Sequence, residues 1–132
     1  MSKSSQSKPP KPTDAELAIL RVLWQRGPST VREVWEELNP KQQTGYTTVL
    51  KIMQIMFDKG LLTRDESDRS HVYQATRSEG QTQRQVMGHL LDRLFSGSAL
   101  KLVMQALATK RATPAELAEI RRLLDEMERG GK

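Results

Sequence analysis

The sequence predicts a mainly α-helical protein with one small β-hairpin, and three observations lead to this fold class. Three amphipathic segments joined by short polar connections occupy residues 13–59. Two short stretches rich in β-forming residues follow directly, and helical apolar spacing then returns from residue 78 onward. A hairpin directly after three such helices is typical of a winged helix-turn-helix. We therefore divide the chain into a basic tail at 1–12, a winged-helix domain at 13–77 and a three-helix region at 78–132.

The composition excludes several classes of protein. The 132-residue chain contains no cysteine, and its two histidines, His71 and His89, are not at metal-ligand spacing. Disulfides, thiolate metal sites and cysteine nucleophiles are therefore excluded, and no residue pair combines a nucleophile with a base. We predict a protein that is not an enzyme and that holds no cofactor and no metal.

The hydropathy of the chain gives an expectation about location. No apolar run approaches the roughly 20 residues that a membrane helix needs. The first residues, "MSKSSQSKPPKP", lack the apolar segment of a secretory signal. We expect no membrane insertion and a cytoplasmic location.

The first helix is predicted to begin at Thr13. The stretch "TDAE" has the pattern of a capping box, in which the Thr13 hydroxyl accepts a backbone N–H and Glu16 reaches back. The stretch "RGP" ends this helix near Gly27. Its apolar residues are Leu17, Leu20, Val22, Leu23 and Trp24.

The second helix has the same start signal, with Thr30 three residues before Glu33 in "STVREVWEEL". We expect Pro40 to close this helix after a short run, because proline disrupts a helix interior. Its apolar residues are Val31, Val34, Trp35 and Leu38. The two tryptophans are interpreted as core anchors.

The third helix lies in "TGYTTVLKIMQIMFDKG" and is predicted to run from a cap at Thr44 to about Lys59. Gly60 takes the left-handed position that stops a helix. The apolar face of this helix consists of Val49, Ile52, Met53 and Met56, and the opposite face of Thr47, Thr48, Lys51 and Gln54. No acidic residue occurs from Leu38 to Phe57.

A polar face of this kind fits the major groove of DNA. Small hydroxyls allow close approach, and Lys51 reaches guanine acceptors or a phosphate. We expect Tyr46, at the helix start, to contact a base or the DNA backbone, and Lys41 to contact a phosphate. The alternative is an ordinary solvated face, in which Thr44 only caps and Tyr46 only packs. The predicted DNA-binding residues on and before this helix are Lys41, Thr44, Tyr46, Thr47, Thr48, Lys51 and Gln54.

The hairpin is predicted from "LLTRDE" and "HVYQA", which are separated by the turn-forming "SDRS". Arg69 lies at the tip and His71 begins the returning strand, so both are positioned to contact an adjacent DNA backbone or minor groove. The nearby acids leave a second interpretation open, in which Arg69 pairs with one of them. These acids are Asp65, Glu66 and Asp68.

Three further helices are predicted after the hairpin, at residues 79–95, at residues 99–108 and from "TPAE" at Thr113 onward. Their apolar residues exceed what about fifty residues can enclose alone, so a second copy of the chain is the simplest cover. We interpret 78–132 as a dimerisation domain. The residues assigned to the dimer interface are Val86, Leu90, Leu91, Leu94, Leu102, Val103, Leu117, Ile120 and Leu124.

The stretches "TDAELAILRVLW", "STVREVWEEL", "YTTVLKIM" and "DKGLLTRDESDRSHVYQA", with the three trailing helices, resemble the BlaI/MecI/CopY family of penicillinase-type repressors. The resemblance covers Thr13 to Met127. It implies a homodimeric winged-helix repressor on an inverted-repeat operator of double-stranded DNA. It also implies a membrane sensor peptidase as a partner and release by an event, such as proteolysis, that disrupts the C-terminal dimerisation helices.

The sequence departs from the family pattern at several places. Ile55-Met56 stands where members often have an "RL" pair, so one basic contact is absent or replaced. Copper sensing through a C-terminal cysteine motif is excluded because the chain has no cysteine. Gln105-Ala106 stands where relatives are cleaved at an Asn-Phe bond and does not match that bond. Release by proteolysis therefore stays open, and a β-lactam signal is not supported.

The charge distribution keeps one rival function open. The net charge of +5 arises from the tail and the C-terminal helices, whereas residues 13–77 carry nine basic and nine acidic residues. A winged-helix module that binds another protein, without operator specificity, would have such a neutral domain. For the tail at 1–12, we expect a disordered arm that is either solvated or follows DNA phosphates.

Overall fold

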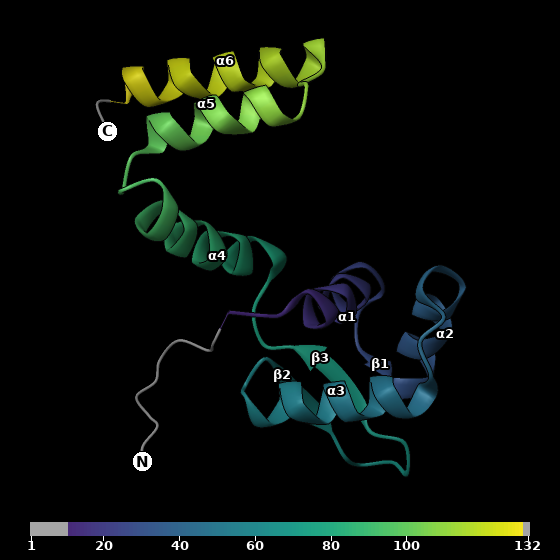
Figure 1. The fold of residues 1–132 in the computed structure, drawn as a ribbon. Coiled ribbons are helices and arrows are strands. Elements are labelled where there is room, and N and C mark those ends of the chain that lie inside the picture. The colour runs from purple at the N-terminus through teal and green to yellow at the C-terminus, as the bar shows by residue number, and fades with distance from the viewer. Residues whose placement is uncertain (1–10, 131–132) are drawn as a thin grey trace, which may run out of the picture. The chain divides into compact units, whose positions relative to one another are not determined.

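A computed structural model describes residues 11–130, except for the side chains of Lys41 and Gln42. Within this range it contains six helices and three strands (Figure 1). The elements in chain order are α1 (Asp14–Arg26), β1 (Ser29–Thr30), α2 (Val31–Gln42), α3 (Tyr46–Asp58), β2 (Leu62–Asp65), β3 (Val72–Ala75), α4 (Glu79–Leu94), α5 (Ala99–Thr109) and α6 (Pro114–Arg129).

The chain forms two compact units, which divide between Val86 and Met87 inside α4. The domain boundary at 77/78 stays a prediction. Most of the predicted basic tail, residues 1–10, lies outside the described residues. None of the helices in the described part of the chain is both long and apolar enough to cross a membrane.

The starts of α1 and α2 are fixed by the two predicted capping boxes. The Glu16 N–H donates to Thr13 Oγ1 at 3.2 Å, and the Thr13 N–H donates to Glu16 Oε1 at 2.9 Å. Thr30 and Glu33 repeat the arrangement with distances of 2.9 and 3.2 Å. Each box satisfies two backbone donors that a helix start would otherwise leave unpaired.

The sheet has three antiparallel strands in the order β1-β3-β2. The predicted hairpin is confirmed, with Leu62 opposite Ala75 and Arg64 opposite Tyr73. Its returning strand begins one residue later than predicted, at Val72. Strand β1 was not predicted, because two residues carry no alternating pattern; Ser29 becomes a strand residue only by pairing with Tyr73.

The core lies between α1, α2, α3 and the sheet. The predicted inner face of α3 is confirmed, since Val49, Met53 and Met56 are at most 1% exposed and Ile52 is half-buried. Other fully buried side chains are Ile19, Val34, Leu62 and Tyr73. The two tryptophans lie partly buried at the edge of this core, and their indole N–H groups bond the carbonyls of Arg77 and Thr44.

Two predicted helix ends are wrong. Helix α2 does not stop at Pro40 but continues to Gln42. Proline disrupts a helix interior, but Pro40 lies in the last turn of α2, only two residues before its end. The end comes at Gln43, which has a left-handed φ of 51° and donates to the Asn39 carbonyl at 2.8 Å.

The predicted cap at Thr44 is also wrong, because α3 begins at Tyr46 and Gly45 occupies the N-cap without a side-chain hydrogen bond. Instead, the Thr44 carbonyl accepts the indole N–H of Trp35 at 2.8 Å. The predicted end of α3 is confirmed: Gly60 follows the C-cap Lys59 with a φ of 87°.

The C-terminal helices match the predicted segments closely. Helix α4 ends at Leu94 and α5 at Thr109, each one residue from the predicted end. Helix α6 begins at Pro114 behind a capping box formed by Thr113 and Glu116. None of the described side chains from residue 87 onward is buried. The described residues of the second compact unit therefore form no buried core within one copy of the chain.

Candidate nucleic-acid interface

The outer face of α3 is the central feature of the candidate site. Thr47, Thr48, Lys51 and Gln54 are all exposed, opposite the buried Val49 and Met53. No acidic residue lies on this helix before its last residue, Asp58. The four predicted polar residues thus form one accessible face without a negative charge.

The start of α3 is held by contacts with α2. Tyr46 is 41% exposed, and its ring forms a T-shaped pair with the Trp35 ring, with centroids 6.0 Å apart and planes at 82°. The Arg32 guanidinium lies 5.8 Å from the Trp35 ring centre. Trp35 also bonds the Thr44 carbonyl, so one tryptophan positions both residues ahead of the polar face. Thr44 contributes through its backbone, and not through a cap.

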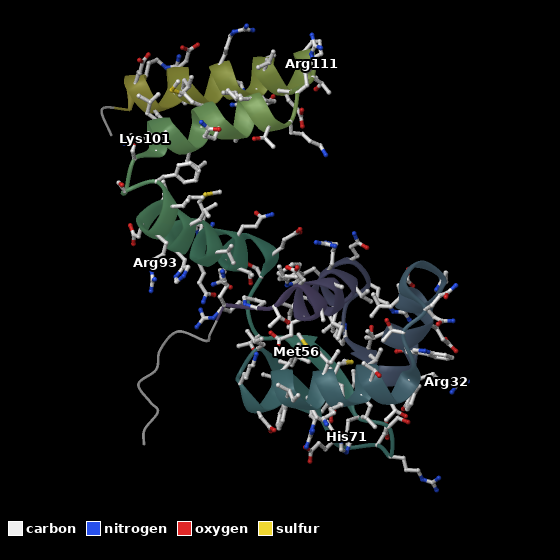
Figure 2. All side chains as sticks on the ribbon, in the orientation of Figure 1. Arg32, Met56, His71, Arg93, Lys101 and Arg111 are labelled. Atoms are coloured by element: carbon white, nitrogen blue, oxygen red, sulfur yellow. The ribbon has the colours of Figure 1, made fainter. Side chains whose placement is uncertain are left out.

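A shallow hollow of about 290 Å³ brings the hairpin tip and α3 together. From the predicted residues it collects Tyr46 and Gln54 of α3 with Arg69 and His71 of the hairpin. Figure 2 shows His71 beside α3, and it shows Arg32 near the start of α2. Arg32 and Ser70 also line the hollow, and sequence reasoning missed both. The only available signal was the position of Arg32 in the first turn of α2.

The hairpin acids do not pair with Arg69. Asp65 accepts hydrogen bonds from the side chain and backbone of Ser67, and these bonds lower its pKa. Glu66 is bound by Arg64, and that hydrogen bond lowers the pKa of Glu66. Among the described residues, no acid lies within ion-pair distance of Arg69, which is exposed. The interpretation of Arg69 as half of an ion pair is therefore wrong.

Arg64 is a second residue that sequence reasoning missed. Its guanidinium carbon lies 4.0 Å from the Phe57 ring centre, near the end of α3. Its Nε donates to Glu66 Oε2 at 2.5 Å and its Nη1 donates to the Tyr73 hydroxyl at 3.4 Å. The hydrogen bond to Glu66 has the largest effect and raises the pKa of Arg64. The hydrogen bond to Tyr73 raises it further. Because strand register brings Arg64 opposite Tyr73, no local sequence signal reveals this cluster.

An ion pair joins the start of α1 to the end of α3. Lys59 Nζ, at the end of α3, lies 2.7 Å from Glu16 Oε2 in the first turn of α1. Glu16 is 3% exposed. Burial raises its pKa, but hydrogen bonds from Lys59 and Thr13 outweigh this and leave the pKa of Glu16 below its ordinary value. The pair fixes the last turn of α3 against α1.

The other predicted site residues belong to other elements of the chain. The side chain of Lys41 is outside the described residues. Gln105 and Ala106 are exposed and lie inside α5, and His89 is exposed on α4. Within residues 11–130, no three potential metal-binding side chains of His, Cys, Asp or Glu come together.

Three helices, a small antiparallel sheet and a hairpin that shares a hollow with the third helix define a winged-helix protein. The sequence profile of the family described as penicillinase repressor matches residues 12–126. The transcriptional regulator BlaI of Mycobacterium tuberculosis is 32% identical over 120 residues, covering 89% of this chain and 85% of the relative. The penicillinase repressor of Bacillus licheniformis is 24% identical over 117 residues, covering 89% and 91%.

Among solved structures, the solution structure of the DNA binding domain of the repressor BlaI superposes with a TM-score of 0.50. It shares 28% sequence identity and covers 55% of this chain and 88% of its own. The chain belongs to the penicillinase repressor family, which is a family of transcriptional repressors. This confirms the resemblance inferred from the sequence.

Proposed function

We propose that this protein represses transcription by binding an inverted-repeat DNA operator as a homodimer, with α3 of each copy in the major groove. The observation that carries the proposal is the exposed, acid-free face of α3 beside the hairpin. The likeness of part of this chain to the DNA binding domain of the repressor BlaI supports the same function.

The chemistry of each side chain indicates which part of the DNA it would contact. Thr47 and Thr48 bring short side chains to base edges, and their methyl groups can touch thymine methyl groups. Lys51 donates to guanine acceptors or to a phosphate. Arg69 and His71 extend the contact from the hairpin to the DNA backbone. Arg32 lines the same hollow and forms an ion pair with Glu36 at 3.4 Å.

Dimerisation is supported by the apolar surface of the second unit. A soluble monomer rarely leaves so large a set of apolar side chains uncovered. The exposed ones are Met87, Leu90, Leu94, Leu100, Val103, Met104, Leu107, Leu123, Leu124 and Met127. A second copy would cover them and would place two α3 helices one DNA turn apart, about 34–36 Å.

Release from DNA would follow from any event that separates the paired C-terminal helices, since each copy alone makes half of the contacts. Cleavage at Gln105-Ala106 by a sensor-activated peptidase is one such event. Because both residues lie inside α5, the peptidase would act only after local unfolding of that helix.

A fluorescence anisotropy titration tests the proposal. The full-length protein is titrated into a labelled duplex from the promoter of its own gene and into a scrambled duplex, at two salt concentrations. We expect preference for the promoter, two chains per duplex, and a logarithmic salt slope of about 0.9 per phosphate contacted. Equal, weak and salt-independent binding to both duplexes, and to genomic fragments, would favour the protein-binding alternative.

A further inference from the structure

The Arg64 cluster joins the end of the recognition helix to the wing. Its guanidinium lies over Phe57 of α3 at 4.0 Å and donates to Glu66 at the start of the hairpin turn. It also reaches the hydroxyl of Tyr73, a β3 residue that is 2% exposed. We propose that Arg64 is a positioning residue, which fixes the wing against α3 and thereby sets the operator preference. This inference rests on the proposed function.

Three features distinguish this cluster from an ordinary surface ion pair. An exposed pair holds two mobile side chains in a high-dielectric solvent and fixes little. The Arg64 side chain, by contrast, is 21% exposed, and groups from three different segments surround it. Stacking of a planar guanidinium on an aromatic face, together with directed hydrogen bonds, restricts its orientation. The cluster therefore restricts the hairpin more than a point charge would.

The same contacts argue against Arg64 as a direct DNA ligand. Its Nε and Nη1 donate within the protein, and its face lies against Phe57. Its effect on DNA would instead be transmitted through the hairpin. Arg69 and His71 share a hollow with Tyr46 and Gln54, so a change in the wing angle would shift the two sides of that hollow relative to each other.

Two substitutions test the inference without removing a positive charge, Glu66→Gln and Tyr73→Phe. Simple electrostatics predicts that loss of the Glu66 charge strengthens binding to any DNA. Positioning predicts the opposite sign for the operator: affinity falls about three- to tenfold for each variant. Tyr73→Phe removes the hydroxyl that accepts from Arg64, and Glu66→Gln replaces a charge-assisted hydrogen bond with a weaker neutral one. Affinity for a scrambled duplex should not fall. Thermal unfolding checks that both variants remain folded.

Two comparison variants sharpen the test. Glu37→Gln neutralises another acid of similar exposure, 55% against 53%, in an ion pair with Arg26 that lies outside the cluster. It should not lower operator affinity. Arg64→Lys keeps the charge but loses the planar fork, and we expect it to behave like Glu66→Gln and not like the wild type.

A DNA-free measurement separates this inference from the proposed function. Backbone amide order in residues 66–71, measured by heteronuclear NOE on the full chain, should decrease in Glu66→Gln, Tyr73→Phe and Arg64→Lys but not in Glu37→Gln. If the wild type prefers no DNA sequence, the proposed function fails and this measurement still tests the positioning. Unchanged wing order, or an operator affinity that equals or exceeds that of the wild type in Glu66→Gln, would overturn the inference.

Discussion

The ion pair between Glu16 and Lys59 provides a quantitative test of how the end of α3 is held. Lys59→Met keeps the aliphatic part of the side chain and leaves the Glu16 carboxylate, 3% exposed, without its cation. Breaking a fully buried pair costs about 3–5 kcal/mol. Because the Lys59 side chain is 30% exposed and Glu16 keeps its bond to the Thr13 N–H, we expect a smaller loss. Our expectation is about 1–3 kcal/mol of unfolding free energy.

The measurement is urea unfolding at pH 7 and at a fixed protein concentration, since dimer dissociation makes stability depend on concentration. Arg122→Met is the matched control, because it removes a cation from an exposed network with Glu119 and Glu126 at 2.9 and 2.6 Å. The control should change stability by less than about 0.5 kcal/mol. A Lys59→Met loss no larger than that of the control would refute the reasoning.

The same pair predicts a pH dependence with a definite sign. The folded-state pKa of Glu16 lies below its ordinary value of 4.5. Its stabilising contribution is therefore fully present above the unfolded-state pKa and is lost as the pH falls through the folded-state pKa. The stability difference between wild type and a Glu16→Gln, Lys59→Met double variant should shrink on acidification below about pH 4.5. A difference that grows on acidification would contradict this assignment.

Three further predictions concern DNA recognition and its support. Lys51→Ala should cost about 1–3 kcal/mol of operator binding and relax the preference at one position if Lys51 contacts a base, or weaken all sequences evenly if it contacts a phosphate. Unchanged affinity would remove Lys51 from the interface. Truncation after Val86 should give a folded monomer with much weaker operator binding in anisotropy and sedimentation, and a truncated dimer would disprove the assignment of the C-terminal helices. Trp35→Phe keeps an aromatic ring, although a smaller one, and loses the bond to the Thr44 carbonyl, so thermal unfolding should show a loss of about 1 kcal/mol. Wild-type stability in that variant would show that the indole N–H is dispensable.

Local features of the sequence determined most of the helix boundaries. The capping boxes at Thr13 and Thr30, the helix start at Thr113 and the left-handed Gly60 depend on neighbours three or four residues away, and all four are present as predicted. The capping box at Thr113 was not predicted. The inner face of α3 followed from helical periodicity, because side chains three and four positions apart share one side of a helix. Family membership followed from the order and spacing of these same segments, and the sequence profile confirms it.

Tertiary structure decided the features whose partners are distant along the chain. Strand β1 exists only because Ser29 pairs with Tyr73, and the Arg64 cluster depends on the same sheet register. Glu16 pairs with Lys59, which lies 43 positions away in the chain. The Trp35 indole N–H donates to the carbonyl of Thr44, a residue that local rules assign to a helix cap. Propensity and periodicity describe each segment alone. These contacts form only when the segments pack together, so the sequence of one segment does not predict them.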